Sequence, residues 1–247
     1  MKDFAKMPPW LAFLIGVGVF LAARQISELP GVLWGDSIAE TLPWLGHAVI
    51  KTVLIIVALI GGLLVTRGKL GQHGYRMPDK WHVWSWLWPG LLIGGITSVT
   101  IILSPAEGMS LKRFGSGLAI LLSLLYSSVS EELFCRGFIQ SLMVHLRLRK
   151  VNLLLARVST PALTSGLLFG AMHLSIYFGG ADILTTVIIV ASTIILGITA
   201  GHLFDKTESL IPAIVVHIGF NLGSFLGGMI ANIALFIATG KLPAAGG

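Results

Sequence analysis

Seven long runs of apolar residues constrain this chain more than any other feature of its sequence. A membrane-spanning helix needs about 20 mostly apolar residues. The stretches that meet or approach this length are 9–28, 44–66, 84–104, 115–145, 161–178, 183–203 and 210–238. In lipid, backbone polar groups must be bonded within helices or a closed barrel, and these runs are too long for barrel strands. The sequence therefore predicts an all-α, polytopic transmembrane helical bundle.

The composition argues against other classes of protein. Of the 247 residues, 55% are hydrophobic and 11% are charged, whereas a soluble domain carries about 25% charged residues. The mean hydropathy is +0.88. A water-soluble globule, a disordered chain and a nucleic-acid binder are therefore poor interpretations. The one cysteine, Cys135, rules out an intrachain disulfide and a thiolate metal cluster, and we expect it to pack between helices.

Basic residues predict the orientation of the chain in the membrane. Cytoplasmic segments are enriched in Lys and Arg, and eleven of the 17 such residues fall on the side of the N-terminus. We therefore expect a cytoplasmic N-terminus and, after seven spans, an outside C-terminus. The last run contains Gly223, Gly227 and Gly228. A break there would give eight spans and return the C-terminus to the cytoplasm.

Three charged residues lie in the middle of the fourth apolar run. Glu131 and Glu132 are followed by Arg136, although charged groups inside a membrane are costly and mark functional sites. Glu132 and Arg136 are four residues apart and therefore face one another on a helix. Glu131 is displaced by about 100° around the helix and is expected to lack that partner, as a working acid/base group would. The alternative is a charge cluster that only holds helices together.

Two later runs each carry a pair of residues one helical turn apart. The fifth run contains Phe169 and His173, and the seventh contains His217 and Asn221. A spacing of four residues places each pair on one face of its helix. A single histidine in a membrane helix more often hydrogen bonds to a neighbouring helix than acts in catalysis. Two histidines, an asparagine and a spare glutamate on three apolar helices are hard to explain by packing alone.

Together the three motifs resemble the signature of the CPBP family, which comprises the CAAX prenyl endopeptidases of the Ras-converting type and the bacteriocin-processing or immunity proteins, also called the Abi family. The motifs that carry the resemblance are, in order, Glu131-Glu132-x-x-x-Arg136, Phe169-x-x-x-His173 and His217-x-x-x-Asn221. The resemblance covers roughly residues 118–222. It implies a single integral membrane domain over 1–247, with variable spans in 1–110 and a catalytic core in 115–238.

The resemblance implies an intramembrane peptidase whose site lies in a cavity among the core helices. It implies that Glu131 is the general base that activates a water, assisted by His173. It also implies that His217 and Asn221 form the oxyanion hole. The other motif residues would have supporting roles. Glu132 and Arg136 would support the site electrostatically, and Phe169 would shape the cavity wall.

The chemistry of these residues favours a reaction without a metal. Peptide hydrolysis needs a nucleophilic water and donors aimed at the developing oxyanion. The amide of Asn221 suits an oxyanion better than it suits zinc, so we expect no cofactor. The alternative is one divalent metal, zinc by preference, held by Glu131, His173 and His217.

Three functions follow as hypotheses. The first is an intramembrane endopeptidase that acts on a membrane-anchored substrate, such as a prenylated CAAX-type or bacteriocin-like peptide. The second is a catalytically silent immunity or scaffold protein of the same fold, although no motif position is lost. The third is a proton-coupled transporter, although transporters typically show paired repeats.

The expected partners are membrane lipid and a hydrophobic or lipidated peptide or protein, not nucleic acid. The expected location is the cytoplasmic membrane of a prokaryote.

Overall fold

The computed structural model describes residues 7–34, 45–104, 117–153 and 156–240. Six helices in these ranges are long and apolar enough to cross a membrane. They are α1 (Pro9–Trp34), α3 (Leu45–Thr66), α4 (Val83–Leu103), α6 (Thr160–His173) with its continuation α7 (Ser175–Phe178), α8 (Ile183–Thr207) and α9 (Leu210–Thr239). The predicted all-α polytopic bundle is therefore confirmed.

The fourth apolar run forms one helix with two kinds of backbone. α5 (Gly117–Glu132) is α-helical, and η4 (Leu133–Gln140) continues it in the wider π conformation. This run corresponds to the expected span over 115–145. Within the described residues its α-helical part comprises 16 residues, and this run is not among the six helices above. π segments frequently occur at functional sites, and this one contains Arg136.

Short elements connect the helices at one end of the bundle. They are the 3-10 turns η2 (Leu70–His73) and η5 (Val144–Leu146) and the strands β1 (Lys150–Asn152) and β2 (Arg157–Ser159). The strands form an antiparallel pair between the expected spans over 115–145 and 161–178. Ser159 ends β2 and also caps α6, because its hydroxyl accepts the backbone N–H of Ala162 at 3.1 Å.

The last helix is continuous, so the alternative of a break at its glycines is wrong. α9 runs over 30 residues as one helix, and Gly223 and Gly227 pack against α4. A methyl group on Gly227 would lie 2.6 Å from the carbonyl oxygen of Gly95, so a side chain at this position would force the helices apart. Small residues at a spacing of four let membrane helices approach closely. α4 thereby fixes the position of α9, which carries His217.

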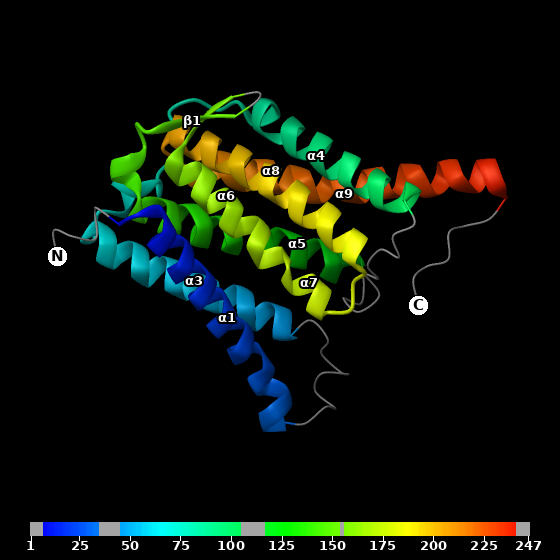
Figure 1. Ribbon diagram of the computed structural model, residues 1–247, viewed down its shortest axis with the longest axis horizontal. Coiled ribbons are helices and arrows are strands. Elements are labelled where there is room, and N and C mark those ends of the chain that lie inside the picture. Colours follow the sequence, from blue (N-terminus) through cyan, green and yellow to red (C-terminus); the bar gives the residue numbers. More distant parts are fainter. Residues whose placement is uncertain (1–6, 35–44, 105–116, 154–155, 241–247) are drawn as a thin grey trace.

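The helices α5, α6 and α8 lie between two helix pairs. Figure 1 shows α1 beside α3 along one edge of the bundle and α4 beside α9 along the other. α3 also contacts α5 and η4, and α6 packs against α8. Phe134 and Ile139 of the π segment are fully buried in one apolar core with Leu168 and Phe169 of α6. The residues of the three motifs therefore lie near the centre of the bundle.

Candidate active site

Four ionisable side chains of the motifs are buried together at the centre of the bundle. Glu131 and Glu132 end α5, Arg136 lies in η4, and His217 lies in α9. Their exposed fractions are 6%, 0%, 0% and 4%, respectively. A buried charge is costly unless it is paired and hydrogen bonded, so the contacts of these groups decide what the site can do.

Arg136 and Glu132 form the ion pair that the sequence predicts. Nε of Arg136 lies 3.1 Å from Oε2 of Glu132, and Nη1 donates to Oε1 at 3.3 Å. The first contact is close but does not meet hydrogen-bond geometry, so it is an ion pair only. Nη2 of Arg136 donates to the carbonyl oxygen of Gly197 in α8 at 2.5 Å. The guanidinium carbon lies 5.2 Å from the ring centre of Phe169, which is within the range of a cation–π contact.

His217 bridges the two glutamates. Its Nδ1 lies 2.9 Å from Oε1 of Glu132, and its Nε2 lies 3.7 Å from Oε2 of Glu131. An ionised carboxylate can only accept hydrogen bonds, so Nδ1 of His217 donates to Glu132. In the neutral ring, Nε2 is then an acceptor that faces Glu131. Arg136, Glu132 and His217 thus form a chain of contacts that orients the imidazole toward Glu131.

Glu131 has a partner that the sequence analysis did not assign. Nζ of Lys51 in α3 donates to Oε1 of Glu131 in a buried ion pair, with side chains that are 9% and 8% exposed. The expectation that Glu131 lacks a compensating charge is therefore wrong. The two residues are 80 positions apart, and they meet only because α3 packs against α5. The sequence contained one signal for this pair. Lys51 lies within an apolar run, and ionisable groups inside a membrane usually have a partner.

The second motif lies beside this cluster. Nδ1 of His173 is 2.8 Å from the carbonyl oxygen of Phe169. A carbonyl only accepts, so Nδ1 carries the proton and Nε2 of His173 is an acceptor. The ring of Phe169 contacts both histidines, with ring centres 4.9 Å from His173 and 5.3 Å from His217. Phe169 thereby links His173 to His217, so α6 contributes to the same site.

Asn221 lies one turn after His217 but contacts α5. Its Nδ2 donates to the hydroxyl of Ser128 at 2.9 Å and to the carbonyl oxygen of Leu124 at 3.3 Å. Ser128 in turn donates to the same carbonyl at 2.9 Å. Both amide hydrogens of Asn221 are therefore used in tying α9 to α5. In this arrangement its amide is not aimed at Glu131.

The alternative of a metal ion held by Glu131, His173 and His217 depends on how these side chains are arranged. Among the residues that the structure describes, no group of three His, Cys, Asp or Glu side chains is arranged to hold one. The ammonium of Lys51 binds Oε1 of Glu131 and balances the charge of that carboxylate. A cation is already built into the site by the chain itself.

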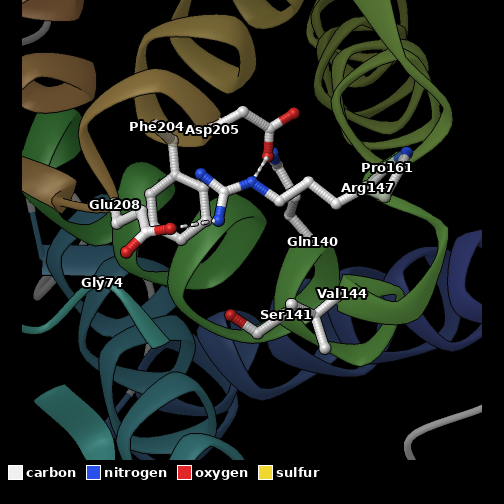
Figure 2. A pocket seen from close by; sticks show the side chains of 9 residues that line it. All are labelled: Gly74, Gln140, Ser141, Val144, Arg147, Pro161, Phe204, Asp205 and Glu208. Atoms are coloured by element: carbon white, nitrogen blue, oxygen red, sulfur yellow. Dashed lines mark hydrogen bonds and ion pairs between the residues drawn. The ribbon is translucent and has the colours of Figure 1, made fainter. Parts of the chain in front are cut away.

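A second polar cluster lies at the end of the bundle that carries the hairpin. A pocket there, shown in Figure 2, is lined by Gly74, Gln140, Ser141, Val144, Arg147, Pro161, Phe204, Asp205 and Glu208. Arg147 lies 3.6 Å from Asp205 and 2.6 Å from Glu208, and Arg76 lies 3.0 Å from Glu208. The hydrogen bond from Arg147 holds the pKa of Glu208 below its ordinary value. These charges pair with one another, so we interpret the cluster as a tie between the C-terminal end of α8, the end of η5 and the segment that carries Arg76.

Comparison with known proteins bears on the three motifs. Residues 113–223 match the family described as type II CAAX prenyl endopeptidase Rce1-like. No curated protein and no solved structure matches the chain. The matched range contains all seven residues that the sequence analysis assigned to the site, whereas Lys51 lies outside it. The family consists of proteases that act on CAAX-type substrates. Over residues 113–223 the chain is therefore similar to the Rce1-like family of type II CAAX prenyl endopeptidases, and this match supports its assignment to the CPBP/CAAX proteases.

Proposed function

We propose that this protein is an intramembrane endopeptidase that hydrolyses a peptide bond of a membrane-anchored substrate with a glutamate-activated water. The observation that carries the proposal is the contact of His217 with both Glu131 and Glu132 in the buried cluster. If the cluster only held helices together, the ion pair between Glu132 and Arg136 would be enough. A second carboxylate that faces an imidazole nitrogen is instead the arrangement that general acid–base chemistry needs.

Glu131 is the proposed general base. Its Oε2 and Nε2 of His217 are two acceptors 3.7 Å apart, so one water that donates a proton to each would satisfy both. The oxygen of such a water directs its lone pairs away from both groups and toward a substrate carbonyl. Glu131 takes a proton as this water attacks the carbonyl carbon, and it gives the proton to the leaving nitrogen as the C–N bond breaks.

The other motif residues assist this reaction. His173, whose Nε2 is an acceptor, helps to orient the water. Asn221 donates an amide hydrogen to the oxyanion once the substrate displaces its contact with Ser128. Glu132 and Arg136 keep the ring of His217 in place. We expect no metal, because the ammonium of Lys51 already balances the charge of Glu131.

The proposed substrate is a hydrophobic or lipidated peptide held in the membrane. Large apolar side chains cover the outer surfaces of the helices, so a substrate that reaches the cluster from the lipid would itself be apolar. The N-terminus is proposed to be cytoplasmic, in a prokaryotic membrane. In support, the loops that carry Arg67, Lys69, Arg147 and Arg149 lie at the same end of the bundle as the start of α1 (Figure 1).

A cleavage assay tests the proposal. The purified protein in lipid nanodiscs is incubated with a farnesylated peptide that ends in a CAAX motif and, separately, with a hydrophobic peptide that lacks the lipid. Mass spectrometry identifies the products. Glu131→Gln is expected to lower kcat by about 10²–10⁴-fold, the usual contribution of a general base. Glu28→Gln, at an exposed position of α1, is the matched control. Equal rates for wild type and Glu131→Gln would contradict the proposal.

A further inference from the structure

We propose that Lys51 is a positioning residue of the active site, and that the N-terminal part of the chain thereby completes a site whose other residues lie in the family region. The inference rests on the proposed function, because it takes Glu131 to be the general base. Lys51 lies in α3, outside the matched residues 113–223. The family match alone therefore does not point to it.

The two carboxylate oxygens of Glu131 have different partners. The ammonium binds Oε1, whereas Oε2 faces Nε2 of His217. A carboxylate held at one oxygen by a strong donor cannot rotate without breaking that contact. Lys51 therefore keeps Oε2 directed toward His217, where the proposed water is activated.

Lys51 also balances the charge of the buried cluster. Glu131 and Glu132 carry two negative charges, and Lys51 and Arg136 carry two positive charges in direct contact with them. Without Lys51, Glu131 would be a buried carboxylate without its cation. Such a group takes up a proton or turns toward water, because burial disfavours its ionised form. A protonated Glu131 cannot accept a proton from the attacking water.

The packing of α3 against α5 sets the position of the ammonium. Nε2 of His47 lies 2.8 Å from Oγ of Ser127, one turn before the contact between Lys51 and Glu131, and both contacts join residues 80 positions apart. The two helices therefore run parallel in a constant register. Thr52 adds a third contact, with its hydroxyl 2.8 Å from that of Tyr126. The contact of His47 with Ser127 holds Lys51 in place through its helix, whereas the contact of Thr52 is exposed and lies outside the buried pair.

Kinetic measurements separate a positioning role from a purely structural one. The full-length protein in nanodiscs is assayed with the farnesylated CAAX peptide. Lys51→Met, which keeps the length of the side chain and removes its charge, is expected to lower kcat about 10²-fold, as misplacement of a reacting group by about 1 Å does, with KM unchanged. Lys51→Arg retains the charge and is expected to recover most of this loss.

The matched control is Thr52→Val. It removes a hydrogen bond of the same helix contact without touching Glu131. Its kcat is expected to stay within about twofold of wild type, because it removes no interaction of the reacting groups. If Lys51→Met and Thr52→Val lower kcat equally, or if Lys51→Met has the kcat of wild type, the inference is overturned.

A second measurement needs no turnover. A hydrophobic carbodiimide reacts with protonated carboxyl groups in membranes, and mass spectrometry measures its addition to Glu131. Labelling is expected to be slow in wild type and in Lys51→Arg, and fast in Lys51→Met. Equal labelling of Glu131 in wild type and Lys51→Met would overturn the inference. Labelling that depends on Lys51 in a protein that cleaves neither peptide would contradict the proposed function and still support the pairing of Lys51 with Glu131.

Discussion

Lys51 of α3 and Glu131 of α5 form a buried ion pair between residues 80 positions apart in the chain. The pair joins the N-terminal helices to the glutamate that we propose as the general base. Buried ion pairs are weak contributors to net stability, but removing one partner costs about 3–5 kcal/mol because the other charge remains buried. We therefore interpret the main role of this pair as fixing the geometry of the site. Its contribution to the stability of the fold is secondary.

Substitution of Asn221 tests whether its amide donates to the oxyanion or only makes a structural contact. If Asn221 donates to the oxyanion, Asn221→Ala is expected to lower kcat by about 10²–10³-fold. Ser128→Ala, which removes only the present partner of the amide, is then expected to have little effect on kcat. Steady-state kinetics on the farnesylated peptide measures both. Similar, small losses in the two variants would instead indicate that Asn221 only ties α9 to α5.

Removal of metal ions is expected to leave the activity unchanged. The ammonium of Lys51 already balances the charge of the Glu131 carboxylate without a metal ion. Purified protein dialysed against a strong chelator is assayed with the same peptide, and its metal content is measured by elemental analysis. Activity that is lost on chelation and restored by one divalent ion would make Glu131, His173 and His217 ligands and reject the glutamate mechanism.

The close packing of α4 and α9 predicts opposite effects for two glycines of α9. A methyl group on Gly223 would meet the backbone of Leu91, whereas one on Gly228 would meet only side-chain atoms at 3.7 Å or more. Gly223→Ala is therefore expected to destabilise the protein by about 1–3 kcal/mol through overpacking. Gly228→Ala is expected to be neutral or stabilising by up to about 1 kcal/mol, because alanine favours a helix. Thermal unfolding in nanodiscs measures both, and equal effects would contradict the packing described.

The ion pairs of Glu208 predict a dependence of stability on pH. The hydrogen bond and charge of Arg147 lower the folded-state pKa of Glu208 below its ordinary value of 4.5. Its contribution to stability is therefore fully present above pH 4.5 and is lost as the pH falls through the lowered folded-state pKa. Because the side chain is 52% exposed, the contribution is expected to be only about 0.2–1 kcal/mol.

This contribution is measured as the difference in unfolding free energy between wild type and Glu208→Gln. The difference is expected to shrink between pH 4.5 and lower pH. A difference that grows as the pH falls would show that Glu208 is not stabilised in its ionised form.

Cysteine labelling tests the orientation. In a Cys135→Ser background, Leu148→Cys places a thiol at the hairpin end, where Leu148 is 91% exposed. Phe178→Cys places one at the opposite end of α6 and α7, where Phe178 is 76% exposed. With a cytoplasmic N-terminus, a membrane-impermeant maleimide is expected to label the second variant in intact cells and the first only after permeabilisation. The reverse pattern would invert the topology.

The sequence by itself determined the helical spans and the residues that share one helix. Span length and the pairing of Glu132 with Arg136 are local properties, because they depend on apolar run length and on a spacing of four residues. For the same reason the pairs Phe169/His173 and His217/Asn221 could be assigned to two helix faces. The start of the last helix was predicted at its observed residue, 210.

Only the tertiary structure decided which buried groups meet. The partner of Glu131 comes from α3, the donors of Asn221 turn to α5, and Gly223 and Gly227 pack against α4. Hydrophobic periodicity shows that a helix is buried but not which neighbour it meets, and the register between two helices is set by their packing. A buried charge in a membrane must find its counter-charge wherever the folded chain places it. For Glu131 that counter-charge is Lys51, which the spacing of residues along one helix could not reveal.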